Sequence, residues 1–173
     1  MVAQEPIIQP PHLIQPSSLV CPCGSSQLLK ACCAVLHAGK VAASAEQLMR
    51  SRYSAYVLGN IDYIVQTTLP AQQQWLDIAA ITAWSQQNQW QGLTVHRALE
   101  KANSRHAQVE FSAAFTDSTG AQTHRELSGF VYAASQWYFL DPTLSQYPAL
   151  KSLCFGGSGQ KFKRCCAPFL GLF

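Results

Sequence analysis

The chain has 173 residues, of which 48% are hydrophobic and 12% are charged. This length supports one domain core with small appended modules, and the composition excludes a disordered protein. The formal net charge of +3 is unevenly distributed, because residues 45–150 carry six basic and eight acidic residues, whereas residues 151–173 carry four basic residues and no acidic one. No stretch approaches the roughly 18 uninterrupted apolar residues that a membrane-spanning helix needs.

Residues 1–18 contain four prolines among Gln and Ser and show no periodicity, which predicts an extended leader. The first nine residues contain no Lys or Arg and no long apolar run, so they do not resemble a secretory signal. We therefore expect a cytoplasmic protein whose cysteines remain reduced. In a reducing compartment, metal binding is favoured over disulfide formation.

Residues 19–41 contain the first of two similar cysteine motifs, with the thiols of Cys21, Cys23, Cys32 and Cys33. Four thiolates that converge from about a dozen residues satisfy a tetrahedral Zn²⁺ ion. So short a segment cannot bury enough apolar surface to fold alone, and bound metal would replace the missing core. A complete shell of four thiolates leaves no open coordination position, so the motif predicts a structural zinc site.

Three helices are predicted next, over residues 45–58, 61–68 and 71–87. Ser44 is suited to cap the first helix, with Gln47 three residues later to return the hydrogen bond. Gly59-Asn60 is suited to end this helix, because both residues tolerate the left-handed backbone of a helix C-terminus. Pro70 stops the second helix, and an apolar side that includes Trp75 and Ile78 predicts the third as a continuous helix.

After residue 89 the hydrophobic period changes to two, which is typical of half-buried strands. Val109, Phe111, Ala113 and Phe115 alternate with more polar residues. Strands are predicted over residues 90–99, 109–116, 124–133 and 136–140, with turns at 117–120 and 134–135. Helices followed by an antiparallel meander indicate an α+β domain over residues 44–150, with the helices packed on one face of a curved sheet.

Five polar residues of this domain are candidates for a pocket. Arg52 lies beside the apolar stripe of the first helix, so its guanidinium is expected to be buried and to need a carboxylate, for which Glu126 and Asp141 are the natural partners. Either such an ion pair fixes the helix to the sheet, or Arg52 binds an anion in a cavity. His124, Glu126 and Ser128 alternate onto one strand face, as an acid–base pair in a pocket or as a satisfied core cluster.

The second cysteine motif, in residues 151–173, has one ligand fewer. It offers the three thiolates of Cys154, Cys165 and Cys166. Gly156 occupies the position that corresponds to Cys23, so this module is degenerate. Three thiolates could bind zinc with a histidine or water as the fourth ligand, or the site could stay empty, and the loss of a ligand favours an empty or weakly occupied site. His96 and His106 lie in polar sequence and are expected to be solvated.

The C-terminal motif also contains a short basic run, Lys161-Phe162-Lys163-Arg164. Three cations with an aromatic side chain for stacking are a weak signal for nucleic-acid binding. The alternative, which we prefer, is that Phe162 packs beneath the module and the cations point into solvent.

Both cysteine motifs resemble the SEC-C motif, a small zinc module. The segments Leu48–Tyr56, Trp90–Leu93 and Trp137–Asp141, together with Glu126 and Phe130, resemble the YchJ-like family, in which SEC-C modules flank a central domain. The resemblance implies a central domain of the nuclear-transport-factor-like, or cystatin-like, cone and zinc at the cysteine motifs. It implies no biochemical activity.

The sequence therefore predicts a zinc-binding protein that is an interaction adaptor for another protein and not an enzyme. The alternative is a small-molecule-binding protein or an acid–base enzyme that uses a pocket in the cone. A cavity on the order of several hundred Å³, with Arg52, Glu126 and His124 converging on it, would favour the alternative. A packed interior, with Arg52 paired to a carboxylate, would favour the adaptor.

Overall fold

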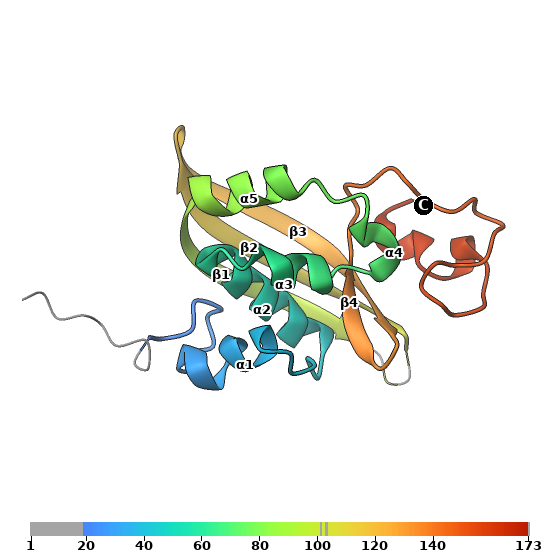
Figure 1. Ribbon diagram of the computed structural model, residues 1–173, viewed down its shortest axis with the longest axis horizontal. Helices are drawn as coiled ribbons and strands as arrows, with labels where there is room; N and C mark the ends of the chain where they lie inside the picture. The colour runs from blue at the N-terminus through green and yellow to red at the C-terminus, as the bar shows by residue number, and fades with distance from the viewer. Residues whose placement is uncertain (1–18, 101, 103, 173) are drawn as a thin grey trace, which may run out of the picture.

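The computed structural model describes residues 19–100, 102 and 104–172, so the leader predicted over residues 1–18 lies outside the described residues. Helices precede a four-stranded antiparallel sheet, which confirms the α+β class (Figure 1). The helical segments are η2 (Leu29–Ala31), α1 (Cys33–His37), α2 (Ala45–Leu58), α3 (Ile61–Gln66), α4 (Pro70–Gln73), α5 (Ile78–Gln87), η3 (Phe162–Arg164) and η4 (Ala167–Leu170). The strands are β1 (Gln89–Glu100), β2 (His106–Asp117), β3 (Gly120–Ala133) and β4 (Gln136–Leu140).

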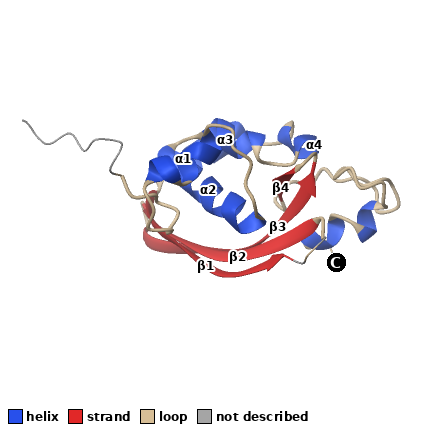
Figure 2. Ribbon diagram, turned by 90° about the horizontal axis from the view of Figure 1, so that it is seen from below, coloured by secondary structure: helices blue, strands red, loops and turns tan. Residues whose placement is uncertain are grey.

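The strands form a meander in the order β1-β2-β3-β4, with every neighbouring pair antiparallel. Two irregularities interrupt the register of β1 with β2, between Trp90 and Gly92 and between Val95 and Arg97. Such bulges increase the local twist and bend a sheet. The resulting curved sheet holds α1, α2 and α3 on its concave side (Figure 2).

Strand β2 has the alternation predicted from its sequence. Val109, Phe111, Ala113 and Phe115 are all buried, whereas the residues between them are partly exposed. The buried face packs against α2 in the main core, together with Leu48, Met49 and Tyr53. The concave face of the sheet is therefore the inner wall of the domain.

The predicted ends of α2 are confirmed. The Ser44 side chain accepts a hydrogen bond from the Gln47 backbone N–H at 3.1 Å, and this bond satisfies one of the free donors of the first turn. Gly59 ends the helix with φ of 69°, in the left-handed region where a side chain would be strained. Asn60 then caps α3 by accepting from the Tyr63 N–H.

The prediction of one helix over residues 71–87 is wrong, because this segment breaks into α4 and α5. Asp77 caps the second piece by accepting a hydrogen bond from the Ala80 N–H at 2.9 Å. Trp75 lies in the connection and is about half exposed, so it does not belong to a buried helical stripe. The capping aspartate supplies a new helix start where no glycine or proline marks a break.

The C-terminal module shares a core with the sheet. Phe162 of η3 is fully buried in a cluster with Val131, Tyr138 and Leu140, and burial of a side chain of this size contributes about 1.5–3 kcal/mol. Gly129 of β3 lies directly beneath η4. Among the helices of the described residues, none combines the length and the apolar character needed to cross a bilayer.

Candidate functional site

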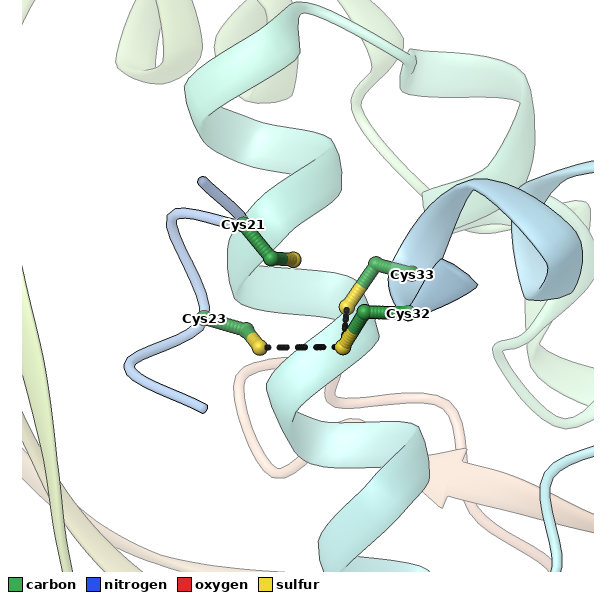
Figure 3. Close-up of side chains that lie close together, drawn as sticks. All are labelled: Cys21, Cys23, Cys32 and Cys33. Atoms are coloured by element: carbon green, nitrogen blue, oxygen red, sulfur yellow. Dashed lines mark hydrogen bonds between the residues drawn. The ribbon is translucent and has the colours of Figure 1, made fainter. Parts of the chain in front are cut away.

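The first cysteine cluster forms between a loop and the start of α1. Cys21 and Cys23 lie in the loop, Cys32 immediately precedes α1, and Cys33 is its first residue. The four sulfur atoms lie within 4.8 Å of one another (Figure 3). The Sγ–Sγ distances are 3.6 Å for Cys23–Cys32 and 3.9 Å for Cys32–Cys33, far longer than a disulfide bond. All four thiols therefore remain available as ligands.

The spacing of these donors fits a zinc ion. A Zn–S bond of about 2.3 Å makes the edge of a tetrahedral four-sulfur shell about 3.8 Å long. The separations of Cys23 from Cys32 and of Cys32 from Cys33 agree with this edge. Hydrogen bonding from the Cys33 thiol lowers the pKa of Cys23 to about 4, and burial raises the pKa of Cys32. Thiolate, the form that coordinates metal, is therefore favoured at Cys23, whereas the pKa values of Cys32 and Cys33 are raised and these thiols would release their protons as metal binds.

Helix α2 positions this module. Arg50 donates a hydrogen bond to the Cys23 carbonyl oxygen at 2.9 Å and pairs with Glu46 at 2.8 Å. The Sγ atom of Cys21 lies 3.9 Å from the Ser54 hydroxyl of the same helix. Gly24 adopts φ of 78°, and a Cβ atom there would lie 3.2 Å from the Leu93 carbonyl oxygen of β1. Sequence reasoning did not identify Arg50, whose contacts link the module to the central domain.

The C-terminal module has the same local structure as the first. The Cys21 N–H donates to the Gln27 carbonyl at 2.7 Å, and the corresponding Cys154 N–H donates to the Gln160 carbonyl at 2.8 Å. In each copy a serine hydroxyl lies close to the sulfur of the first cysteine of the closing Cys-Cys pair. Ser25 Oγ lies 3.2 Å from Cys32 Sγ, and Ser158 Oγ lies 3.1 Å from Cys165 Sγ. The degenerate copy has therefore kept its geometry.

A histidine of strand β2 lies beside two cysteines of the C-terminal module. His106 Nε2 lies 3.3 Å from Cys166 Sγ and 3.7 Å from Cys165 Sγ, and the three donor atoms form a possible metal-binding group. The expectation that His106 is solvated is wrong, because Phe169 stacks on its ring at 4.4 Å. Burial, together with the charge of Arg105, lowers the pKa of His106 to about 4, so its imidazole is neutral.

The basic run of this module lies at its surface. Phe162 is fully buried, whereas the side chains of Lys161 and Arg164 are exposed and that of Lys163 is partly exposed. This arrangement matches the preferred interpretation, in which the aromatic side chain packs beneath the module. Phe162 is therefore inaccessible to a nucleic-acid base.

A cavity of about 120 Å³ opens between α2, α5 and the concave face of the sheet. Its wall is predominantly aromatic and includes Tyr53, Tyr56, Trp84, Trp90, Phe111 and Phe130. Arg52, His124, Glu126 and Ser128 add polar groups to this wall, so four of the five predicted pocket residues meet at one cavity. Its volume is smaller than the size, on the order of several hundred Å³, that was expected of a small-molecule pocket, but it is close to that of an apolar cavity of about 150 Å³ that accepts benzene.

The polar groups of β3 form one hydrogen-bonded chain. Glu126 Oε2 lies 2.9 Å from His124 Nε2, and the Ser128 hydroxyl donates to Glu126 Oε1 at 2.6 Å. Burial opposes ionisation of Glu126, but the hydrogen bonds from His124 and Ser128 lower its pKa overall. The hydrogen bond to Glu126 raises the pKa of His124. Charge is therefore favoured on both members of the pair.

Arg52 does not form the ion pair expected from the sequence. Its NH1 group donates to the Ile64 carbonyl at 2.8 Å and to the Thr67 and Thr68 hydroxyls at 2.7 and 3.3 Å. Its guanidinium carbon lies 4.3 Å from the centre of the Phe139 ring. The C-terminal carbonyls of a helix carry partial negative charge, and here the end of α3 takes the place of the expected carboxylate. Burial lowers the pKa of Arg52, but an arginine remains charged.

Asp141 is not among the residues that line the cavity. Its carboxylate accepts hydrogen bonds from the Thr143 N–H and hydroxyl at 2.8 and 2.6 Å, in the turn that follows β4. Its backbone N–H and carbonyl bond to the buried side-chain amide of Gln72. The expected role of Asp141 as a pocket residue is therefore replaced by a role in this turn.

Comparison with known proteins identifies similar families and structures. The family model for the YchJ middle NTF2-like domain matches residues 44–142. A SEC-C motif containing protein from Psychrobacter arcticus is 46% identical, with 88% of this chain and 98% of that chain covered and a TM-score of 0.82. A SEC-C motif containing protein from Rhodopseudomonas palustris is 38% identical, with coverages of 71% and 96% and a TM-score of 0.65.

Proposed function

This chain belongs to the YchJ family of SEC-C motif containing proteins, and we propose that it is a zinc-binding protein whose central cavity binds a small organic molecule. Zinc at the first module would be structural, because its four thiolates leave no coordination position for a substrate. The observation that carries the binding proposal is the convergence of Arg52, His124 and Glu126 on an aromatic cavity. Aromatic walls with a few convergent polar groups are typical of ligand sites.

The cavity's size and polar groups define the class of ligand. A volume of about 120 Å³ accommodates one ring with a small substituent. Arg52 has guanidinium N–H groups beyond NH1 for which the described residues supply no hydrogen-bond acceptor. A carbonyl oxygen would accept from Arg52. When His124 is neutral, Glu126 balances the charge of Arg52, so a ligand carboxylate would add an unbalanced negative charge to the cavity. We therefore expect a neutral, single-ring molecule with a carbonyl group.

Benzamide is a suitable probe for this site. At about 0.45 kcal/mol per non-hydrogen atom, its nine such atoms give an expected dissociation constant of about 1 mM. Binding would change the fluorescence of Trp84 and Trp90, which line the cavity, and would shift the amide NMR signals of β2 and β3. Benzoate and benzylamine, of similar size but opposite charge, would test whether the site selects a neutral ligand.

Two alanine substitutions in β2 make a matched pair for this test. Ala113→Leu fills the cavity, because Ala113 is one of its lining residues. Ala114→Leu adds the same volume to the next residue, whose side chain points to the other face of the strand. We expect benzamide binding to be lost in the first variant and retained in the second. Equal binding by both variants, or no binding of benzamide to the wild type, would reject the ligand site.

A second candidate function is interaction with another cytoplasmic protein through the first module. Leu19, Val20 and Leu28 are 41, 56 and 41% exposed on this module, and Val20 and Leu28 pair across its loop. A zinc-closed module would hold this apolar surface rigid. A partner retained from cell extract by the wild type, and lost both with chelator and in Val20→Asp, would support the adaptor. Retention that is insensitive to both would reject this surface.

A further inference from the structure

The missing cysteine of the C-terminal module leaves a specific gap in its donor set. The three cysteines of this module correspond to Cys21, Cys32 and Cys33 of the first module, because the two copies share their turn hydrogen bonds. A Cβ atom at Gly156 would lie only 2.8 Å from Cys166 Sγ and 3.6 Å from Cys154 Sγ. Real Cβ atoms do not approach a sulfur as closely as 2.8 Å, so this position has no room for a fourth thiol in the present arrangement.

An imidazole nitrogen lies beside the sulfurs instead. A tetrahedral zinc ion with Zn–S of about 2.3 Å and Zn–N of about 2.0–2.1 Å requires sulfur-to-nitrogen separations of about 3.6 Å. His106 Nε2 lies 3.3 and 3.7 Å from Cys166 and Cys165, and these two sulfurs are 3.9 Å apart. The three separations are close to those of one face of such a tetrahedron. Cys154 Sγ lies outside this group of mutually close donors, so it would have to move toward the imidazole to complete the shell.

Neighbouring contacts hold the histidine and the module in this arrangement. Phe169 stacks on the His106 ring with an angle of 8° between the two planes. Arg105 donates hydrogen bonds to the Gly156 carbonyl at 3.0 Å and to the Tyr132 carbonyl at 3.2 Å, and so links the cysteine loop to β3. The stacking by Phe169 holds the imidazole, and the Arg105 hydrogen bonds hold the cysteine loop beside it.

We propose that Cys154, Cys165, Cys166 and His106 bind a second zinc ion, with His106 in place of the missing cysteine. Three of these ligands belong to the C-terminal module and the fourth belongs to β2 of the central domain. The second zinc therefore fastens the module to the sheet. The first zinc, in contrast, takes all four ligands from its own module and adds no bond to the central domain.

The test measures zinc per chain by native mass spectrometry on the full chain. We expect two zinc ions in the wild type and one in His106→Ala, because the first cluster remains intact. His96→Ala is the matched control, since His96 is an exposed strand histidine whose Nε2 hydrogen-bonds Ser112 and no other described residue. This control should keep two zinc ions. A single zinc ion in the wild type, or two in His106→Ala, would overturn the proposal.

A rescue variant distinguishes ligation by His106 from a purely structural role. His106→Cys supplies a thiolate from the same strand position and should restore the second ion. In a background with Cys21→Ser and Cys23→Ser, which removes the first site, Co²⁺ bound to the remaining site should show charge-transfer absorption from three thiolates. With His106→Cys added, it should show four. Unchanged absorption per Co²⁺ ion between the two proteins would contradict ligation at residue 106.

Hydrogen exchange measures the effect of the proposed metal link between the C-terminal module and β2. With His106→Ala, protection of residues 151–172 should fall while protection of residues 19–41 stays the same. The reverse result, or no change in either segment, would contradict a metal link between the C-terminal module and β2. Because one zinc ion should persist at the first module, failure of this site is distinguishable from a protein that binds no zinc.

Discussion

Replacement of Thr67 by valine tests how Arg52 is held in the interior. The Thr67 hydroxyl accepts a hydrogen bond from Arg52 at 2.7 Å and donates one to the Tyr63 carbonyl at 2.6 Å. Valine has nearly the same shape but cannot accept from the guanidinium. A hydrogen bond to a charged group contributes about 1.5–3 kcal/mol, so Thr67→Val should lower the free energy of unfolding by this amount. For a chain of this length, that corresponds to a fall in Tm of about 3–12 °C.

The matched control is Thr82→Val in α5. Thr82 donates the same kind of helix bond, to the Ile78 carbonyl at 2.7 Å, but its hydroxyl makes no bond to a cation within the described residues. Its replacement should change stability by less than about 0.5 kcal/mol. Urea unfolding at a fixed zinc concentration would measure both variants. If Thr67→Val behaved like Thr82→Val, while Asp141→Asn cost about 3 kcal/mol or more, carboxylates would hold Arg52 and our account of its contacts would be refuted.

Two further predictions concern the metal module and the pair on β3. Cys23→Ser should lose the first zinc, whose binding would supply about 10–16 kcal/mol of folding energy. Hydrogen exchange should then show lower protection of residues 19–41 beside an intact central domain. Full protection of this segment would contradict a structural role for the ion. The raised pKa of His124 stabilises the fold fully below its ordinary value of 6.5, and this stabilisation is lost as pH rises through the raised value. The lowered pKa of Glu126 stabilises the fold above its ordinary value of 4.5, so both contributions are present between pH 4.5 and 6.5. The difference in unfolding free energy between wild type and His124→Gln should therefore shrink between pH 6 and 8.5, and a constant difference would show that the pair does not titrate with folding.

The first cysteine cluster was predictable because its four ligands are close together in the sequence. Cys21 and Cys33 lie 12 positions apart, so loop closure brings the sulfurs together at little entropic cost. His106 lies 59 and 60 positions from Cys165 and Cys166, and only the fold brings it to them. The available signal was the missing ligand at Gly156, which required a donor from elsewhere in the chain.

The misassigned interior contacts have a similar explanation. The burial of Arg52 followed from its place beside an apolar helical stripe, but its partners did not. A carboxylate is the usual partner of a buried arginine, whereas here the Ile64 carbonyl and the Thr67 hydroxyl at the end of α3 provide the acceptors. Helix ends depend on local capping, and here the position of α3 against α2 decides which acceptors face the guanidinium.

The buried face of β2 was predicted correctly from the sequence, because burial alternates from residue 106 to residue 116 of this strand. Period-two alternation determines which face of a strand is buried, so it also placed His124, Glu126 and Ser128 on one face. The size of the cavity was not predictable, because it depends on how far the side chains of α2 and α5 fill the concave face. Trp84 of α5 partly fills this space and leaves about 120 Å³.

Native mass spectrometry of the wild-type chain, purified without added zinc, is the most direct test of metal binding by the cysteine clusters. We predict a folded chain with two zinc ions and all seven cysteines in the thiol or thiolate form. A folded chain that carries no zinc, or one whose mass shows cysteines joined as disulfides, would contradict the account.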